Sequence, residues 1–513
     1  MTLREKILKT FLVTIREINT HGGPEVFFDK YPVGGMYYGE GNALRNEIGL
    51  EVGSQMTYET LLTCKKHSRK RLWICADGCH IRGQKLSNNT KSLAASGDME
   101  TDAYNYGKSV GMQLNDKGVD CVLGPAIDMC FDHTTIWGLS NDPELTAKLY
   151  RQVIRGIRDQ GVCTTAKHFP GMGSHHLNMH VAPGQNVLPF DRWMETYGYT
   201  YQEMFKEGCD SVMTTHITLR SYDDETHEGY WPIATYSDKL TTKLLKEELG
   251  FQGAVITDAL VMGGMATGDL VAETVQAFKC GADFLLWPPV EAAEVIEEKI
   301  LSGEIPMSRL EDALARIERM EKFRFEALEK EAFDKPDPEF SDNTNAQLIR
   351  NGICLLRDSD NMLPLNKDKL RSVLIINASE DLEGNGCKLL KEELEARGIR
   401  ADIKREIFDE DSFVCWQSDI DALEKDYDLV LFHVQTEHRI WNIPLLIIWG
   451  SHLFKKSKKV IINYGSEYFA HDYFPEDPTF IQMNCSPSSI AVKALAERLF
   501  GEEAFVGKPA LKL

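Results

Sequence analysis

The fold is decided by two stretches, Gly253-Ala254-Val255-Ile256-Thr257-Asp258 and Lys167-His168-Phe169-Pro170-Gly171-Met172-Gly173. Each ends an apolar, β-branched run at polar or glycine residues, as a buried parallel strand does where it emerges into a loop. In a barrel of parallel strands these ends meet at one rim. The sequence therefore predicts that Asp258 lies on the same rim as the Lys167-His168 pair.

Strand-like runs alternate with segments of helical periodicity through the first part of the chain. Helical periods occupy, for example, Glu144 to Gln160 and Lys239 to Leu249. The strands are expected at Val33 to Tyr38, Arg71 to Ala76, Cys121 to Ile127, Val162 to His168, Ser211 to His216, Ala254 to Thr257 and Ala282 to Trp287. Repeated βα units predict a parallel sheet, here an α/β fold with a TIM-type (β/α)8-like barrel.

The length predicts two domains, because 513 residues exceed the size at which one hydrophobic core stops growing. The barrel is expected over residues 1–333 and closes with a helix at Met307 to Phe323. The acidic, proline-containing residues 334–342 are typical of an exposed linker. Residues 343–513 predict a smaller layered α/β domain, with strands at Ser372 to Ile376, Asp428 to Val434, Leu445 to Trp449, Lys459 to Asn463 and Thr479 to Met483.

The charge balance excludes some classes of partner. The chain has 57 Lys and Arg against 78 Asp and Glu, a net charge of −21, which disfavours nucleic acid and anionic membranes and favours a small neutral or modestly charged substrate. Met1 to Thr20 mixes charges into a helical apolar pattern, which predicts one amphipathic helix and no signal peptide. With no apolar run near the roughly 18 residues of a membrane span, we expect a cytoplasmic protein.

Cysteine and histidine patterns give no persuasive metal site. The 12 cysteines form no paired CxxC motifs, and most lie inside apolar runs, so we expect neither a disulfide framework nor a cofactor. His175, His176 and His180 have spacings that zinc could tolerate. No nearby cysteine or carboxylate completes the ligand set, so no metal is expected.

Polar residues follow several of the expected strands. Asp77, Asp128, Lys167 with His168, His216 and Asp258 each stand at the downstream boundary of a strand. Barrel enzymes place their chemistry at this end of the strands. Several such residues together predict a pocket.

Four segments in order and spacing resemble glycoside hydrolase family three: Lys167-His168-Phe169-Pro170-Gly171, Met213-Thr214-Thr215-His216-Ile217, Pro232 to Ser237 and Leu249 to Asp258. The Lys-His-Phe-Pro-Gly run resembles the β-N-acetylglucosaminidase branch of that family. Leu355 to Leu365 and Asn463-Tyr464-Gly465-Ser466 are similar to its C-terminal α/β sandwich domain.

The resemblance implies the residues of a retaining glycosidase. Asp258 matches the family's nucleophile, with Met262 in a supporting position downstream, although a lone Asp after a strand can also cap a helix. The branch's acid/base histidine matches His180. The aspartate that holds this histidine is replaced by Asn178, which can orient the ring but supplies no charge. His175 and His176 therefore remain alternatives or supporting residues.

The resemblance also implies a sugar-binding group. Lys167, His168 and Asp77 match residues that bind sugar hydroxyls, an arrangement suited to charge-assisted hydrogen bonds. His216 either lines the same pocket or supports it from behind. Trp137 stands where the family has an arginine, so an apolar stacking surface replaces a planar cation.

The expected function is an exo-acting, retaining β-glycosidase that hydrolyses O-glycosyl bonds of β-N-acetylglucosaminides through a covalent glycosyl-aspartate. Two alternatives keep the same covalent chemistry: a β-glucosidase-like specificity, and a glycoside phosphorylase, which the uncharged Asn178 would make friendlier to phosphate. A third is a non-catalytic carbohydrate-binding relative. The C-terminal domain has no acidic residue assignable to the site, and covering the barrel or supporting a homodimer are the roles open to it.

Overall fold

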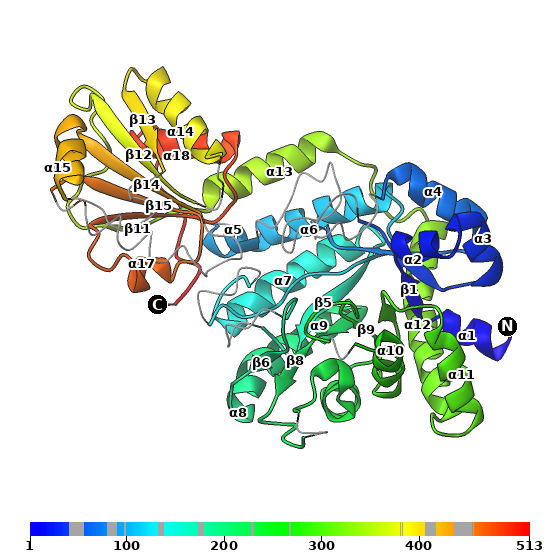
Figure 1. Cartoon of the computed structure of the whole chain (residues 1–513). Coiled ribbons are helices and arrows are strands. Elements are labelled where there is room, and N and C mark those ends of the chain that lie inside the picture. Colours follow the sequence, from blue (N-terminus) through cyan, green and yellow to red (C-terminus); the bar gives the residue numbers. More distant parts are fainter. Residues whose placement is uncertain are drawn as a thin grey trace. The chain divides into compact units, whose positions relative to one another are not determined.

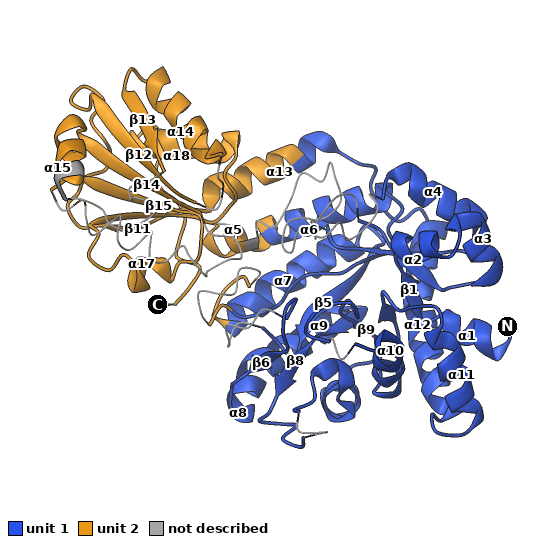
Figure 2. Cartoon of the chain, viewed as in Figure 1, with its two compact units in different colours: residues 1–87, 103–129, 143–341 blue, residues 88–102, 130–142, 342–513 orange. Residues whose placement is uncertain are grey.

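The computed structural model describes residues 1–39, 56–78, 90–96, 99–131, 138–172, 179–226, 230–265, 268–379, 381, 383–405, 417–435, 454 and 456–512. The chain forms two compact units (Figure 2). Unit 1 comprises Met1–Ser87, Ala103–Met129 and Pro143–Ser341, and unit 2 comprises Asn88–Asp102, Cys130–Asp142 and Asp342–Leu513. Each unit is described by itself below.

The unit boundaries differ from the contiguous domains expected at 1–333 and 343–513. Two segments that follow barrel strands, residues 88–102 and 130–142, group with unit 2. Helix α13 (Pro338–Asn351) begins inside the stretch 334–342 that the sequence predicts as a linker. Pairing between distant segments is not visible in local sequence pattern, which explains the difference.

The described residues of unit 1 contain an eight-stranded sheet in which all neighbouring strands run parallel. Its order is β10-β1-β2-β3-β4-β5-β7-β9, and a parallel bridge between Ile256 and Phe284 brings its two edges together. The strands are β1 (Phe11–Val13), β2 (Gly35–Tyr37), β3 (Trp73–Ala76), β4 (Cys121–Val122), β5 (Cys163–Phe169), β7 (Ser211–Thr214), β9 (Ala254–Thr257) and β10 (Leu285–Leu286). This nearly closed barrel confirms the predicted fold class.

Helices surround the barrel strands in unit 1 (Figure 1). They include α6 (Met99–Asp116), α7 (Pro143–Arg158), α8 (Phe190–Trp193), α10 (Leu270–Lys279), α11 (Ala292–Leu301) and α12 (Met307–Glu329), with the π-helices η2 (Met194–Gly198) and η4 (Lys239–Glu248). Helix α7 shows why they form, because Leu149, Val153 and Ile157 recur at helical spacing and are buried. A short parallel pair, β6 (Gly184–Asn186) and β8 (Ile217–Leu219), lies outside the main sheet.

The single helix predicted over Met1 to Thr20 is wrong. The structure has α1 (Leu3–Leu8), then β1, then α2 (Ile15–Thr20). All three residues of β1 are fully buried, and the strand is paired on both edges. A run of three apolar residues is too short for periodicity to separate a strand from a helix.

Side chains from most of the barrel strands fill the barrel interior, as in other barrels of this class. They include Leu12, Trp73, Cys121, Met213 and Ile256. Helix α12 adds Ile317 and Met320 to the same cluster. The barrel is therefore a packed core, and any site must lie at the strand ends.

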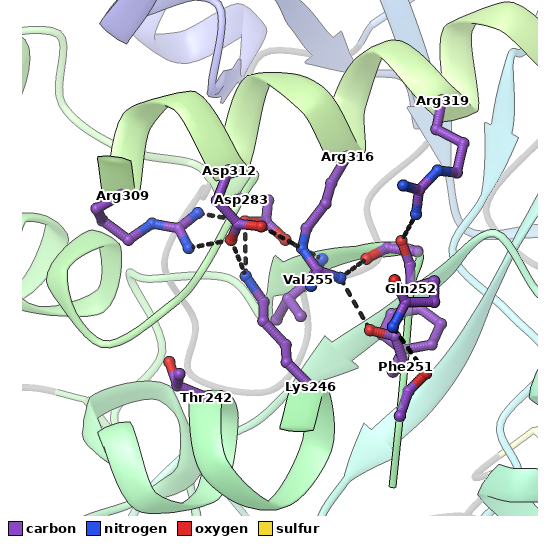
Figure 3. A network of polar contacts seen from close by, with 12 residues as sticks. Thr242, Lys246, Phe251, Gln252, Val255, Asp283, Arg309, Asp312, Arg316 and Arg319 are labelled. Carbon is purple, nitrogen blue, oxygen red and sulfur yellow. Dashed lines mark hydrogen bonds and ion pairs between the residues drawn. The ribbon is translucent and has the colours of Figure 1, made fainter. Parts of the chain in front are cut away.

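Helix α12 also crosses the N-terminal ends of the strands, where its side chains form hydrogen bonds and ion pairs (Figure 3). The Arg316 guanidinium donates to the carbonyl oxygens of Phe251 at 2.9 Å and Gly253 at 2.7 Å, just before β9. Arg324 donates to Asp120 at 2.9 Å, just before β4. These contacts fix the helix to the end of the barrel opposite the predicted site.

The described part of unit 2 holds a six-stranded sheet in the order β11-β16-β15-β14-β12-β13, parallel except where β11 meets β16. Helices lie on both faces (Figure 1). The elements are β11 (Ile353–Asp358), β12 (Ser372–Ser379), α14 (Asn385–Ala396), β13 (Arg400–Lys404), α15 (Gln417–Asp426), β14 (Leu429–Gln435), β15 (Lys459–Asn463), α17 (Phe469–Asp472), β16 (Thr479–Met483) and α18 (Ser489–Leu499). The strand expected at Leu445 to Trp449 lies outside the described residues.

Two further expectations concern membranes and cysteines. No helix in the described part of the chain is both long enough and apolar enough to span a bilayer. The ten cysteines that the structure describes are all buried and none forms a disulfide. Burial raises the pKa of most of these thiols, for example that of Cys121 to about 12, so they behave as small apolar side chains.

Candidate active site

Asp258 follows β9 directly and is 8% exposed. Its backbone N–H donates to the Thr214 carbonyl at 2.7 Å, which fixes the residue at the strand end. The Thr215 hydroxyl donates to Oδ2 at 2.7 Å, and the Ala259 N–H donates to Oδ1 at 2.8 Å. The carboxylate is therefore held in one orientation by neutral donors, and no arginine or lysine among the described residues bonds to it.

Burial, the largest single influence, raises the pKa of the Asp258 carboxyl, and the nearby His168 is the largest of the influences that lower it. His216, the Thr215 hydrogen bond and the Lys167 ammonium lower it further, so the pKa lies below its ordinary value. Asp258 is thus ionised at neutral pH. An ionised, dehydrated carboxylate is the state that a glycosidase nucleophile requires.

Lys167 and Asp77 form an ion pair at the ends of β5 and β3. The Lys167 Nζ lies 2.6 Å from Asp77 Oδ1, and the two side chains are 16% and 21% exposed. The Tyr37 hydroxyl donates to the other oxygen of Asp77 at 3.2 Å. This partly open pair offers both charged donors and charged acceptors to sugar hydroxyls.

His168 is oriented by Asp128, which is completely buried. The imidazole Nδ1 lies 2.7 Å from Asp128 Oδ2. Oδ1 accepts the backbone N–H groups of His168 at 3.3 Å and Met172 at 2.8 Å. Because Nδ1 is committed to Asp128, a substrate contact of this ring is made through Nε2.

The turn after His168 is held by aromatic residues of α8 and η2. The Trp193 indole N–H donates to the Pro170 carbonyl at 2.6 Å, and the Tyr197 hydroxyl donates to the Met172 carbonyl. Gly171 has a φ of +112°, and a Cβ there would lie 2.2 Å from the Tyr197 ring. Only glycine fits this position.

The segment that carries His180 lies against the segment that follows Asp258. The Gly263 N–H donates to the His180 carbonyl at 2.9 Å, and the Gly264 N–H donates to the Met179 carbonyl at 3.0 Å. A Cβ on Gly264 would lie 2.5 Å from the Met179 carbonyl oxygen. The glycine pair thus permits two backbone hydrogen bonds between the predicted acid/base segment and the nucleophile segment.

His216 is completely buried, and protein atoms occupy both of its ring nitrogens. Nδ1 lies 3.0 Å from the Thr235 hydroxyl and Nε2 lies 3.1 Å from the Ala259 carbonyl. Burial lowers the pKa of His216, so the ring is neutral at pH 7. The sequence leaves two roles open for His216, lining the pocket or supporting it from behind. These bonds favour the supporting role.

The structure gathers Asp77, Lys167, His168, His216 and Asp258 at one end of the barrel. Met262 is half-buried, packs against the barrel core and donates its N–H to the Ala259 carbonyl at 3.1 Å. The remaining predicted site residues lie outside the described residues: Trp137, His175, His176 and Asn178.

Three supporting residues were not identified from sequence. Thr215 bonds Asp258, Tyr37 bonds Asp77, and Trp193 bonds the turn after His168. Thr215 and Tyr37 stand within or beside predicted strands, where an apolar or hydroxyl side chain gives no functional signal. Their role could be inferred only from their position beside a strand-end carboxylate. That position depends on the register of the barrel strands, which the sequence does not display.

Comparison with known proteins gives relatives with two kinds of activity in their names. Residues 2–320 match the family profile described as the Glycosyl hydrolase family 3 N terminal domain. "Probable beta-glucosidase F" of Aspergillus fumigatus is 29% identical over 325 residues, covering 55% of this chain and 35% of the relative. "Beta-N-acetylglucosaminidase/beta-glucosidase" of Cellulomonas fimi is 25% identical over 316 residues, covering 58% and 55%.

Solved structures share the fold over the whole chain. "Beta-glucoside phosphorylase BglX" matches with a TM-score of 0.83 and 22% identity, covering 100% of this chain and 94% of that one. A family 3 β-N-acetylglucosaminidase from Paenibacillus sp. matches with a TM-score of 0.80 and 20% identity, covering 100% and 99%. The chain spans about a third to about half of the length of the curated relatives above. With its family profile matched over 2–320, the chain belongs to glycosyl hydrolase family 3.

Proposed function

We propose that the protein is an exo-acting, retaining β-glycosidase that hydrolyses β-N-acetylglucosaminides. The observation that carries the proposal is the buried Asp258 carboxylate at the end of β9, which is ionised, accepts the Thr215 hydroxyl and bonds to no cation in the part of the chain that the structure describes. A carboxylate paired to arginine is a poor nucleophile, whereas this one is oriented and keeps its charge for the reaction. The Lys167-His168-Phe169-Pro170-Gly171 run favours the acetylglucosaminide over the glucoside.

In the first proposed step, a carboxylate oxygen of Asp258 forms a bond to the anomeric carbon of the sugar. The bond between that carbon and the leaving oxygen breaks, and its electron pair stays on the oxygen. His180 donates a proton to that oxygen, so the aglycone departs as an alcohol. The product of this step is a glycosyl ester on Asp258.

In the second step, water attacks the anomeric carbon from the face that the aglycone left. His180, now neutral, accepts a proton from that water, and the ester bond to Asp258 breaks. Two displacements at the same carbon return the original β configuration. The enzyme regains the ionised Asp258 and protonated His180 with which it began.

The glycone is proposed to lie over Lys167, Asp77 and His168. The ammonium and carboxylate of the pair at 2.6 Å are partly exposed, so sugar hydroxyls can bond to both without a large desolvation cost. His168, locked by Asp128, presents its other ring nitrogen in a fixed direction. Such groups bind hydroxyls in both ground and transition states, and their loss should affect KM as well as kcat.

A phosphorylase is a second candidate, favoured by Asn178. An aspartate at that position would repel phosphate near the acid/base segment, and an asparagine does not. Phosphate would then attack the glycosyl ester in place of water and leave a sugar 1-phosphate. The first half of the reaction, including the role of Asp258, would be unchanged.

The test is release of nitrophenol from aryl β-N-acetylglucosaminide and β-glucoside, each with and without phosphate. Turnover of the acetylglucosaminide, unaffected by phosphate, is the expected result. Stimulation by phosphate with a sugar 1-phosphate product would move the function to a phosphorylase. No turnover of any aryl glycoside by the folded protein would contradict the glycosidase proposal and favour a carbohydrate-binding protein.

A further inference from the structure

A short segment of unit 2, Lys508–Lys512, bonds to the residues that follow barrel strand β4; we name it the strap. The Ser140 hydroxyl donates to the Ala510 carbonyl at 2.5 Å. The Asn141 side chain donates to the Lys512 carbonyl at 3.0 Å and accepts the Lys512 N–H at 2.9 Å. These three bonds join the strap to the end of the segment 130–142.

Glu467 fixes the strap from the other side. It follows the Asn463-Tyr464-Gly465-Ser466 motif after β15, and it is 3% exposed. Its carboxylate accepts the N–H of Ala510 at 2.9 and 3.1 Å and the N–H of Leu511 at 3.0 Å. Bonds from two consecutive backbone N–H groups to a buried carboxylate are charge-assisted and specify one position of the strap.

The residue after Glu467 holds the start of the same segment. The Tyr468 hydroxyl donates to the Cys130 carbonyl at 2.8 Å, and the Cys130 N–H donates to the Ser140 carbonyl at 3.1 Å. Both ends of the segment 130–142 are therefore bonded to one small region. Cys130 stands two residues after Asp128, the carboxylate that orients His168.

The strap also bonds to the segment that follows β3. The Lys508 N–H donates to the Ala95 carbonyl at 3.1 Å. Nearby in unit 2, the Ser92 hydroxyl donates to the Asn484 carbonyl at 2.5 Å. Strand β3 ends at Ala76, directly before Asp77. One strap thus bonds the two segments that leave the barrel after the strands carrying Asp77 and Asp128.

We propose that Glu467 is a positioning residue for the sugar site, acting through the strap on the segment 130–142 and so on Asp128 and His168. This rests on the proposed function, because it takes His168 to be a sugar-binding group. The C-terminal unit would then contribute to sugar binding without placing an acidic residue of its own at the reacting atoms. Glu467 would act on His168 indirectly, through the strap, the segment 130–142 and Asp128.

A carboxylate is needed at position 467 because of the number of hydrogen-bond donors that face it. Two backbone N–H groups point at Glu467, and a carboxylate has two oxygens that accept them. A glutamine oxygen in the place of Oε2 can still accept both N–H groups, but the glutamine NH2 group then takes the place of Oε1 and faces the Ala510 N–H. Glu467→Gln therefore replaces the 2.9 Å bond from Ala510 by two donors that face each other, with almost no change of volume.

The test compares Glu467→Gln with Asp358→Asn. Asp358 is a matched control in the same unit, because its carboxylate accepts two consecutive backbone N–H groups, Met362 at 3.0 Å and Leu363 at 3.1 Å, away from the strap. For Glu467→Gln we expect faster hydrogen exchange at Cys130, Phe131 and residues 138–142. We also expect KM for the aryl glycoside to rise roughly tenfold with kcat within about twofold. Asp358→Asn should change neither.

Unchanged exchange at Cys130, Phe131 and residues 138–142 would overturn the inference, and so would faster exchange with a wild-type KM. Exchange is measured without substrate, so it judges the strap separately from the proposed glycosidase activity. Asn141→Ala is the second variant, because it removes two strap bonds without touching a buried charge. It should reproduce the exchange result if Glu467→Gln does not fold.

Discussion

Among the described residues, three aspartates that stand at the C-terminal ends of barrel strands differ in their partners from three that stand at the N-terminal ends. At the C-terminal ends of the strands, Asp77, Asp128 and Asp258 are bonded to a lysine, a histidine and a threonine hydroxyl. At the N-terminal ends, three aspartates each accept the backbone N–H of a neighbouring strand and pair with arginine or lysine: Asp120, Asp210 and Asp283.

The N-terminal set repeats one arrangement three times. Each aspartate stands just before its own strand and accepts an N–H of the preceding strand, from Ile74 at 3.0 Å, Thr164 at 3.0 Å and Val255 at 2.8 Å. Around Asp283 the partners are the Lys246 ammonium at 2.8 Å and the Arg309 guanidinium (Figure 3). Every oxygen is occupied by a donor that substrate cannot replace.

The difference teaches which carboxylates can do chemistry. Arginine does not release its proton, and a fully bonded aspartate has no capacity for a new partner. The C-terminal set instead pairs carboxylates with groups that can exchange bonds with sugar hydroxyls or move a proton. We therefore expect substitutions at one end to change rates and substitutions at the other to change stability.

The largest effect is expected for Asp258→Ala. Loss of the proposed nucleophile should lower kcat by about 10⁴-fold, or roughly 5 kcal/mol in the barrier, with an unchanged melting temperature. Steady-state kinetics on an aryl glycoside checks this. Added azide should restore part of the rate, because the small anion fits the space of the lost carboxylate and attacks the anomeric carbon in its place. The expected product is an α-glycosyl azide. A variant that keeps near-wild-type kcat would remove Asp258 from the mechanism.

Asp283→Asn should show the opposite behaviour. It leaves the buried Lys246 and Arg309 with one partner fewer, so the free energy of unfolding should fall by about 3–5 kcal/mol while kcat stays near wild type. Urea unfolding measures the first and steady-state kinetics the second. Asp312→Asn is the control in the same network, because its carboxylate is 40% exposed and its loss should cost less. A large fall in kcat for the folded Asp283→Asn would break the distinction between the two ends.

Gly264→Ala should separate proton donation from nucleophilic attack. The added Cβ would displace the segment that carries His180, so rates for poor leaving groups should fall about 10²-fold and rates for dinitrophenyl glycosides should not. Gly107→Ala is the steric control, since its Cβ would lie 2.2 Å from the Val153 carbonyl between α6 and α7. Equal losses for all leaving groups would show that the glycine pair does not position the acid/base.

Thr215→Val should have the smallest effect. The Thr215 hydrogen bond lowers the pKa of Asp258, so its removal raises that pKa and moves the acid limb of kcat/KM to higher pH. The rate at the plateau should fall by about tenfold at most. The pH dependence of kcat/KM measures both. An acid limb that does not move would assign that limb to a group other than Asp258.

The sequence alone predicts much of what lies at the C-terminal ends of the strands. The run Ala254 to Asp258 predicts a buried strand ending in a carboxylate, and the structure has β9 with Asp258 directly after it. The role of Asp120 and Asp283 could not be recognised, because nothing in the local sequence shows that Arg324 and Arg309 of α12 pair with them. The strand β1 was missed for its shortness, and the strap because its bonds to Ser140 and Asn141 join residues more than 300 positions apart.

The supporting residues of the site divide in the same way. Lys167, His168 and Asp77 carry charge at strand ends, a pattern that local sequence displays. Thr215 and Tyr37 act through single hydroxyls whose importance depends on which carboxylate the barrel register places beside them. Charge is visible in a sequence, whereas a hydrogen bond between strands is a property of the closed sheet.

The most direct measurement is covalent trapping of the wild-type enzyme with a 5-fluoro glycosyl fluoride of the sugar that the enzyme hydrolyses, followed by peptide mass spectrometry. Fluorine slows both steps, and the reactive leaving group lets the glycosyl ester accumulate. We predict one label per chain, on the peptide containing Asp258 and at that residue. A label on another carboxylate, or turnover with no covalent adduct, would contradict the assignment of Asp258 as the nucleophile of this barrel.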